Sequence, residues 1–178
     1  MSLSRTIIHG PIGRACTTVT TLGPLGTRMS APGTWGSGAG LLLYSVVLAR
    51  FNNASHWMVF AGILATLALV AIVLCTIAEK HLGKKDPGEI ILDEFVAIPI
   101  VYIGAETSTF RAAGTQWIWL WVFVGFALFR LFDITKPFGI RRLQYLPGGI
   151  GIVVDDLAAA TAACALLHIL HFLWALVF

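Results

Sequence analysis

The sequence predicts an all-α protein, a compact multi-helix bundle in a membrane with about five apolar helices. Of the 178 residues, 57% are hydrophobic and only 12% are charged. This charged fraction is about half that of an ordinary globular protein. Apolar runs alternate with polar joints that contain glycine and proline. Because a soluble chain of this length could not bury so much apolar surface, we expect lipid to surround much of it.

The apolar runs differ in length. They cover residues 38–51, 57–78, 95–104, 115–132 and 157–178. The second, fourth and fifth have about 20 residues each, enough for a helix to span the hydrocarbon core. The first is shorter, and the third is too short unless its helix begins near Pro87. We expect these two to be re-entrant or buried against the other helices.

Basic residues predict the orientation. If the N-terminus is cytoplasmic and every run crosses, ten of the twelve Lys and Arg residues lie inside, and only Arg50 and Arg111 lie outside. Such a bias is typical of cytoplasmic loops. The inside residues are Arg5, Arg14, Arg28, Lys80, Lys84, Lys85, Arg130, Lys136, Arg141 and Arg142. Arg141 and Arg142 are interpreted first as inside-loop charges and second as contacts for lipid head groups.

The same orientation gathers the acidic residues. Eight of the nine lie within 79–94 and 130–156, on the cytoplasmic side, and only Glu106 lies elsewhere. Carboxylates at a membrane entry are costly without a cation or a partner. We therefore expect a functional site on this side. A transporter or proton relay, which is one alternative function, would instead need carboxylates along a path across the membrane.

The first run follows a glycine-rich segment, residues 31–38. Glycines let backbone N–H groups converge on an anion, and a following helix start helps to hold phosphate. A flexible entry loop is an equally good interpretation.

The third run follows a pattern that predicts a helix start. Asp86 would be the N-cap, Pro87 the first helical residue and Glu89 the third. Glu89 and Asp93 would then share one helical face. Asp93 and Glu94 enter an apolar stretch, where paired carboxylates are costly. We expect these two residues to be functional.

The fourth run ends with charged residues, and two interpretations remain open. Arg130 and Asp133 are three residues apart and could form a helix-end ion pair, while Lys136 suits the helix dipole. Alternatively, Asp133 binds a metal while Arg130 and Lys136 face phosphate oxygens. Before the last run, Asp155 and Asp156 stand in apolar surroundings, which favours a role in metal binding.

Other polar residues have ordinary interpretations. His168 and His171 are expected to pack or form hydrogen bonds inside the last helix. Cys16, Cys75 and Cys164 are widely spaced, and no arginine follows six residues after any of them, as a cysteine phosphatase would require. We expect reduced structural cysteines.

Four of these segments resemble the phosphatidylglycerophosphatase A family. They are APGTWGS at 31–37, DPGEIILDEF at 86–95, FRLFDITKP at 129–137 and GGIGIVVDD at 148–156. Their order also matches, and together they cover most of residues 20–160. The combination is specific, although each piece is weak alone.

The resemblance implies a multi-pass enzyme of the bacterial inner membrane that hydrolyses phosphatidylglycerophosphate with Mg²⁺, with its active site on the cytoplasmic side. A single domain is expected over 31–178, after a cytoplasmic segment at 1–30. The acidic motif positions, taken as metal ligands, are Glu89, Asp93, Glu94, Asp133, Asp155 and Asp156. The basic positions are Arg130 and Lys136, and the substrate-binding loop positions are Gly33, Thr34, Gly36 and Ser37.

These residues also suit the chemistry on their own terms. Hard oxygen ligands suit Mg²⁺. Arg130 and Lys136 could offset charge in the transition state, and Asp93 or Glu94 could accept a proton from water. The predicted catalytic residues are these four and Asp133. The alternatives are the transporter, a noncatalytic scaffold and another metal-dependent lipid phosphotransferase. The sequence contains neither a nucleic-acid-binding module nor the DxDx(T/V) pattern of aspartyl-phosphate enzymes.

Overall fold

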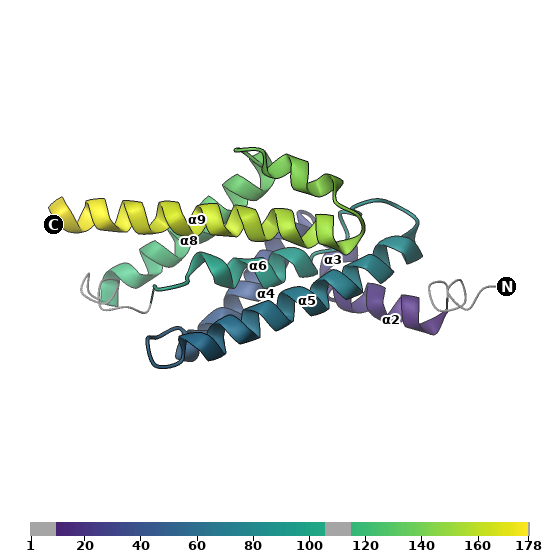
Figure 1. The fold of residues 1–178 in the computed structure, drawn as a ribbon, viewed down its shortest axis with the longest axis horizontal. Coiled ribbons are helices and arrows are strands. Elements are labelled where there is room, and N and C mark those ends of the chain that lie inside the picture. The colour runs from purple at the N-terminus through teal and green to yellow at the C-terminus, as the bar shows by residue number, and fades with distance from the viewer. Residues whose placement is uncertain (1–9, 106–114, 178) are drawn as a thin grey trace.

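A computed structural model describes residues 10–105 and 115–177. Every regular element in this part of the chain is a helix, which confirms the predicted all-α fold (Figure 1). In chain order the elements are α2 (Pro11–Thr20), α3 (Pro24–Arg28), α4 (Pro32–Val46), η1 (Leu48–Phe51), α5 (Trp57–Leu82), α6 (Leu92–Val101), α8 (Thr115–Thr135), η2 (Ile140–Tyr145) and α9 (Gly149–Val177). The interpretations of Arg5, Glu106 and Arg111 lie outside the described residues.

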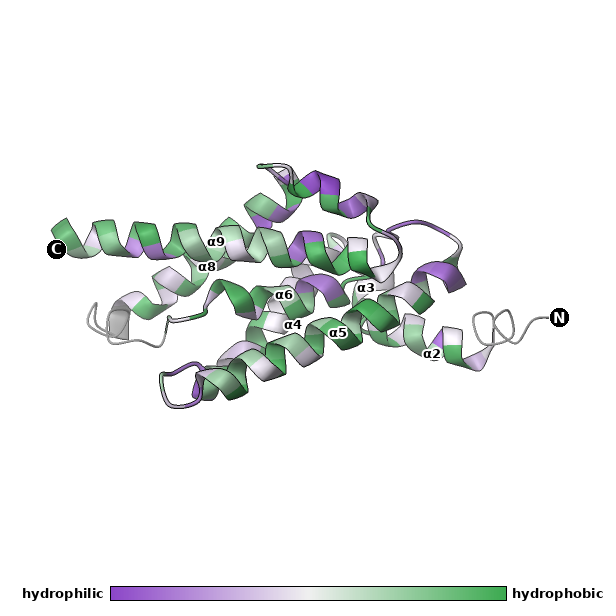
Figure 2. Ribbon diagram, in the orientation of Figure 1, coloured by the Kyte–Doolittle hydropathy of each residue, from purple (hydrophilic) through white to green (hydrophobic). Residues whose placement is uncertain are grey.

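Three of the described helices, α5, α8 and α9, are long and apolar enough to cross a membrane. Only 22% of the most apolar stretch of α5, and the same share in α8, is buried inside the protein. Leu69, Val73 and Phe123 are among the large side chains left exposed. An apolar surface of this extent is stable in lipid and not in water. Figure 2 shows hydrophobic residues, in green, along most of the length of these helices. Three long apolar helices with exposed apolar side chains indicate that the chain is a membrane protein.

Helix α6 is short and lies inside the bundle. Its ten residues extend only about 15 Å at the usual helical rise. It contacts α4, α5, α8 and α9, and Val96, Ala97, Ile98 and Val101 are all buried. Of the possibilities expected for the third run, burial against the other helices is therefore the one observed.

The predicted helix start at Asp86 is wrong, because α6 begins at Leu92. Asp86 has a φ of 48°, in the left-handed region, and its carboxylate accepts a hydrogen bond from Gln144 at 3.3 Å. The N–H of Ile91 donates to the carbonyl oxygen of Thr20 at 2.9 Å. These contacts hold the segment against α2 and against the α8–α9 connection. Asp86 therefore does not cap α6, and Glu89 does not share a helical face with Asp93, because Glu89 precedes the helix.

Residues 32–38 are also not a loop. They form the first two turns of α4, which begins at Pro32. Proline suits this position because its fixed φ is helical and its missing N–H needs no partner. The structure therefore has neither the flexible entry loop nor the anion-binding loop predicted for these residues. The part of the anion-binding prediction that holds is the start of a helix at this position.

The last helix begins earlier than predicted, at Gly149, so that Asp155 and Asp156 lie inside α9 rather than before it. The N–H of Gly149 donates to Oγ1 of Thr76 in α5 at 2.8 Å. This bond satisfies one of the unpaired N–H groups at the start of α9. A Cβ on Gly149 would lie 2.1 Å from the carbonyl oxygen of Ile72, so glycine is required for α9 to approach α5 this closely.

A buried polar network closes the other end of α6. The amide nitrogen of Asn52 donates to the carbonyl oxygen of Tyr102 at 2.5 Å and to the hydroxyl of Tyr44 at 2.8 Å. The amide oxygen of Asn52 accepts from the N–H of Gly104 at 3.0 Å. The hydroxyl of Tyr102 donates to the carbonyl oxygen of Val122 in α8 at 2.7 Å. Through Asn52, the residue that follows η1, the network ties α4, α6 and α8 together.

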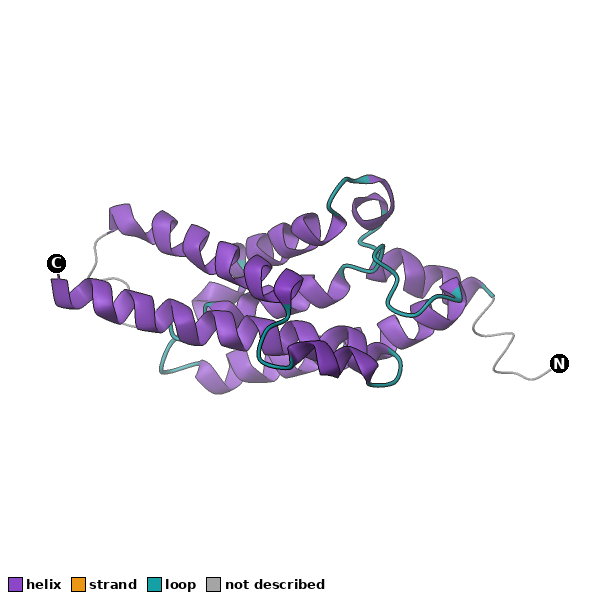
Figure 3. Cartoon of the chain, turned by 90° about the horizontal axis from the view of Figure 1, so that it is seen from above, coloured by secondary structure: helices purple, strands orange, loops and turns teal. Residues whose placement is uncertain are grey.

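The helices lie along a common direction and alternate in sense (Figures 1 and 3). Helices α4, α6 and α9 leave one end of the bundle, and α5 and α8 return to it. All four sequence motifs consequently lie at that end, which we call the motif end. Helix α2 packs against α5. The division of the chain at residue 30 stays a prediction.

Candidate functional site

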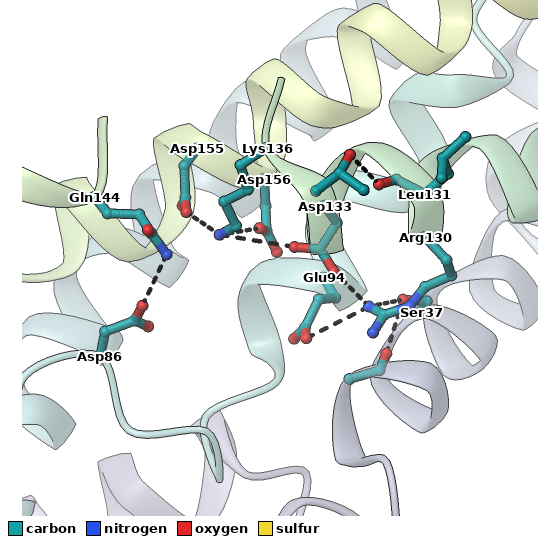
Figure 4. A network of polar contacts seen from close by, with 12 residues as sticks. Ser37, Asp86, Glu94, Arg130, Leu131, Asp133, Lys136, Gln144, Asp155 and Asp156 are labelled. Atoms are coloured by element: carbon teal, nitrogen blue, oxygen red, sulfur yellow. Dashed lines mark hydrogen bonds and ion pairs between the residues drawn. The ribbon is translucent and has the colours of Figure 1, made fainter. Parts of the chain in front are cut away.

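Four helices bring polar side chains together at the motif end (Figure 4). They are the first turns of α4, α6 and α9 and the last turns of α8 with the residue that follows it. The side chains are Ser37, Asp93, Glu94, Arg130, Asp133, Lys136, Asp155 and Asp156. Residues far apart in the sequence meet here, such as Ser37 and Arg130, which are 93 positions apart.

Three carboxylates form an acidic cluster, Asp93, Glu94 and Asp156. Each offers one oxygen, and these oxygens lie within 4.8 Å of one another. Asp93 and Asp156 are 7% and 2% exposed, and the side chain of Glu94 is 13% exposed. Oδ1 of Asp93, Oε2 of Glu94 and Oδ2 of Asp156 are buried and have no hydrogen-bond partner in the described part of the chain. Converging, unpaired carboxylate oxygens fit a metal ion.

The ionisation of Asp93 depends on the charges beside it. Asp93 lies on α6, which is not one of the spanning helices. Burial raises the pKa of Asp93 well above its ordinary value, and the charges of Glu94 and Asp156 raise it further. A cation among these carboxylates would oppose all three effects, because it favours the ionised form. The cluster could therefore hold a metal ion with its carboxylates charged.

Arg130 connects the acidic cluster to α4. Its Nη1 lies 2.7 Å from Oδ2 of Asp133, which confirms the predicted ion pair at the end of α8. The same nitrogen lies 3.7 Å from Oε1 of Glu94 and donates to Oγ of Ser37 at 3.3 Å. Nε of Arg130 is buried and has no hydrogen-bond partner among the described residues. The guanidinium therefore keeps a donor available for an anion.

Lys136 follows α8 and turns back toward the carboxylates. Its φ of 44° is left-handed, and its ammonium group forms an ion pair with Asp155. Nζ also lies 3.7 Å from Oδ1 of Asp156 and 3.8 Å from Oδ1 of Asp133. Burial alone would lower the pKa of Lys136, but the charges of Asp156, Asp155 and Asp133 raise it above its usual value. Lys136 therefore stays protonated and positively charged.

The charges of the site do not balance while all of its carboxylates are ionised. Two basic groups, Arg130 and Lys136, face five carboxylates, and if all are ionised the site carries three more negative than positive charges. Such an excess is expensive at the end of apolar helices. A bound divalent cation would remove most of it.

The glycines of α4 allow it to lie directly against the site. A Cβ on Gly33 would lie 2.2 Å from Oε1 of Glu94 and 3.1 Å from the guanidinium of Arg130. A Cβ on Gly36 would lie 2.7 Å from the carbonyl oxygen of Ile91. Close approach of helices is therefore one reason for glycine at both positions.

Comparison with known proteins decides the family. The phosphatidylglycerophosphatase A model matches residues 18–171. The chain belongs to the phosphatidylglycerophosphatase A family. The Haemophilus influenzae phosphatidylglycerophosphatase A is 38% identical over 134 residues, which are 75% of this chain and 74% of the relative. The Escherichia coli phosphatidylglycerophosphatase A is 28% identical over 146 residues, 82% of this chain and 77% of the relative.

A third relative carries a different substrate in its name. A Bacteroides thetaiotaomicron protein, named provisionally as a phosphatidylinositol-3-phosphatase, is 32% identical over 146 residues, 78% of this chain and 82% of the relative. No solved structure matches this chain.

Membership of the phosphatidylglycerophosphatase A family confirms the predicted resemblance and the predicted class of enzyme, a phosphatase. All four motif segments lie inside the matched region, and they are the segments that meet at the motif end. A phosphatase also accounts for acidic and basic groups in one place. The transporter and the noncatalytic scaffold explain neither the membership nor this arrangement.

The structure does not bring every candidate residue to the site. The carboxylate of Glu89 is 42% exposed, lies 3.7 Å from Nζ of Lys84, and is not part of the acidic cluster. Thr34 is exposed on α4, whereas Ser37 is buried and donates to the carbonyl oxygen of Gly33 at 2.8 Å. Asp133 and Asp155 contact the basic groups instead of completing the acidic cluster.

The other polar residues behave largely as expected. The cysteines are free. Nδ1 of His168 lies 2.9 Å from the carbonyl oxygen of Cys164, and the ring of His171 packs edge-on against Trp121 at 4.9 Å between centroids. Sequence reasoning missed Thr76 and Asn52, which orient the helices of the site. A single polar residue in or beside an apolar run is the only signal that could have indicated them.

The close packing of α4 on α6 can be tested with two alanine substitutions on the same helix. Gly36→Ala should lower the free energy of unfolding by about 1–3 kcal/mol and reduce activity, because its Cβ would overlap the Ile91 backbone. At Gly38 an added Cβ meets nothing within 4 Å, so Gly38→Ala is the matched control. Thermal unfolding in detergent measures both variants. Equal stability of the two would contradict this packing.

Proposed function

We propose that this chain removes the terminal phosphate of phosphatidylglycerophosphate in a Mg²⁺-dependent reaction, giving phosphatidylglycerol and phosphate. The observation that carries the proposal is the set of unpaired oxygens on Asp93, Glu94 and Asp156 next to the guanidinium of Arg130. A metal site beside a fixed cation is what a phosphomonoester needs. The substrate is the one in the names of the Haemophilus and Escherichia relatives.

The acidic cluster is the proposed Mg²⁺ site. Asp93 and Glu94 from α6 and Asp156 from α9 supply the hard oxygen ligands that Mg²⁺ prefers. When bound, Mg²⁺ would polarise a phosphoryl oxygen and orient a water molecule. Asp133 and Asp155 have a different role, which is to hold Arg130 and Lys136 beside the cluster.

Arg130 and Lys136 are the proposed partners of the phosphate oxygens. Arg130 has an unpartnered Nε and lies next to the first turn of α4, where Gly33 and Ser37 line the approach. The N-terminus of α4, Thr34 included, adds the partial positive charge of its N–H groups. Lys136 can turn from its carboxylates to the phosphate because its ammonium needs no fixed bidentate geometry.

Glu94 is the proposed proton acceptor, through the carboxylate oxygen that does not bind the metal. Its side chain is the most exposed of the acidic cluster, so it is the member that water reaches most easily. As the oxygen of water bonds to phosphorus, Glu94 takes a proton, and the phosphorus–oxygen bond to glycerol breaks. The departing glycerol oxygen then takes up a proton from solvent water. Arg130 offsets the charge that builds on the phosphoryl oxygens.

We place this reaction in phospholipid biosynthesis at the cytoplasmic face of the bacterial inner membrane. The charge bias supports that side, because Lys80, Lys84 and Arg142 are among the basic residues at the motif end, whereas Arg50 lies at the other end. An active site at a helix end also meets the phosphate at the level of the lipid head groups.

The proposal is tested by phosphate release from phosphatidylglycerophosphate, measured with purified protein in detergent with and without Mg²⁺. Release should require Mg²⁺ and stop when the metal is chelated. Phosphatidylinositol 3-phosphate is the comparison substrate, because the Bacteroides relative carries it in its name. Faster release from that lipid would reject phosphatidylglycerophosphate as the substrate while leaving a lipid phosphatase.

The acidic cluster is tested with Asp156→Asn, which preserves size and removes charge. Turnover should fall on the order of 100-fold or more, and Mg²⁺ affinity should fall with it, because a ligand is lost. Glu89→Gln is the control, since Glu89 lies in the motif that contains Asp93 and Glu94 but stays outside the cluster. Equal losses in the two variants would show that the cluster is misassigned.

Lys136→Met separates phosphate binding from metal binding. The value of kcat/KM should fall on the order of 100-fold, because a cation that stabilises the phosphoryl oxygens is removed. Mg²⁺ affinity should be unchanged or higher, since a positive charge leaves the neighbourhood of Asp156. Lys80→Met, at an exposed position of the motif end, is the control. Loss of Mg²⁺ binding in Lys136→Met would overturn this role.

A further inference from the structure

The connection between α8 and α9 exposes both aromatic and basic side chains. We call residues 137–147 the basic loop. It contains Arg141 and Arg142, both exposed, and no acidic residue. Phe138 is 87% exposed and Tyr145 is 76% exposed. The site chemistry uses none of these four side chains.

The basic loop starts directly at the site and is held in an unusual conformation. Lys136 has a φ of 44°, Phe138 of 57° and Gly139 of 83°. A left-handed conformation costs on the order of 1 kcal/mol for a residue with a side chain. Phe138 gains little from packing in return, since it is 87% exposed and its ring meets that of Phe132 edge-on, at 6.3 Å between centroids. The backbone thus places Lys136 inward and Phe138 outward only two residues apart.

Contacts with the neighbouring connection fix the other half of the basic loop. The side chain of Gln144 donates to Asp86 at 3.3 Å, and Nζ of Lys85 lies 5.8 Å from the centroid of the Tyr145 ring. Lys85 thereby joins the same exposed surface. Neither Arg141 nor Arg142 forms an ion pair with any residue in the described ranges. The two guanidinium groups are free to bind anions.

We propose that the basic loop is a docking surface for the anionic head groups of membrane lipids, and that it delivers a head group to Arg130 and Lys136. Exposed aromatic rings beside the ends of spanning helices lie at the level of the lipid head groups. Arginines at this level attract anionic lipids. The complementary charge favours a lipid over a protein partner. Lipid binding by the basic loop does not depend on the proposed function. Only the statement that the delivered lipid is the substrate rests on it.

Binding can be measured without turnover. The full-length protein, freed of lipid in detergent, is given an equimolar mixture of phosphatidylglycerol and phosphatidylcholine, and the retained lipids are quantified by mass spectrometry. The wild type should retain an excess of phosphatidylglycerol. In Arg141→Gln/Arg142→Gln this excess should fall by about fivefold for each arginine removed. Added inorganic phosphate should not displace the lipid.

Two variants serve as controls for this measurement. Arg50→Gln removes an exposed arginine at the opposite end and should keep the excess. Arg141→Lys/Arg142→Lys keeps the charge and should keep most of the excess. An unchanged ratio in the double glutamine variant, an equal fall in Arg50→Gln, or displacement by phosphate would each overturn the docking surface.

Phosphate release by the same preparations separates this inference from the proposed function. Arginine-dependent retention of phosphatidylglycerol by a protein that releases no phosphate would reject the proposed function alone. If the protein is fully active but its excess of phosphatidylglycerol over phosphatidylcholine does not depend on Arg141 and Arg142, the docking surface alone is rejected.

Discussion

The architecture depends on one electrostatic constraint, the burial of several carboxylates where apolar helices end. Asp93 and Asp156 are almost completely buried, and the acidic cluster has unpaired oxygens. Such groups are tolerated only with compensating positive charge. Arg130 and Lys136 supply part of it through Asp133 and Asp155, and the acidic cluster could hold a cation that supplies more. The structural ion pairs and the acidic cluster are thus parts of a single charge arrangement.

The rest of the bundle holds this arrangement in place. Glycine at positions 33 and 36 lets α4 lie against Glu94 and Arg130, and Gly149 lets α9 lie against α5. At the opposite end Asn52 ties the end of α6 to its neighbours. Because α6 is short and enclosed, small shifts of its neighbours would move Asp93 and Glu94. Residues far from the chemistry therefore determine its geometry.

A phosphatase built on this plan needs little covalent chemistry from the protein. Hydrolysis of a phosphomonoester depends mostly on positioning and on charge stabilisation. Rigid helix ends provide the positioning, and the acidic and basic groups provide the stabilisation. The proposed placement at the membrane surface would let a lipid present its head group while its acyl chains remain among the helices' exposed apolar side chains. The family membership and the geometry are consistent in this respect.

The helical class, the three long spanning runs and the gathering of the motifs at one end could all be predicted from the amino-acid sequence, because hydrophobic period, run length and charge bias are local or additive properties. The sequence also identified Asp93, Glu94 and Asp156, since a carboxylate in an apolar run is conspicuous without any knowledge of its neighbours. The start of α6 at Leu92 and the exclusion of Glu89 from the acidic cluster could not be predicted in this way, because a hydrogen bond from Ile91 to the distant Thr20 overrides a local capping pattern. The pairing of Lys136 with Asp155 was likewise settled by the crossing of α8 and α9, which no local pattern encodes.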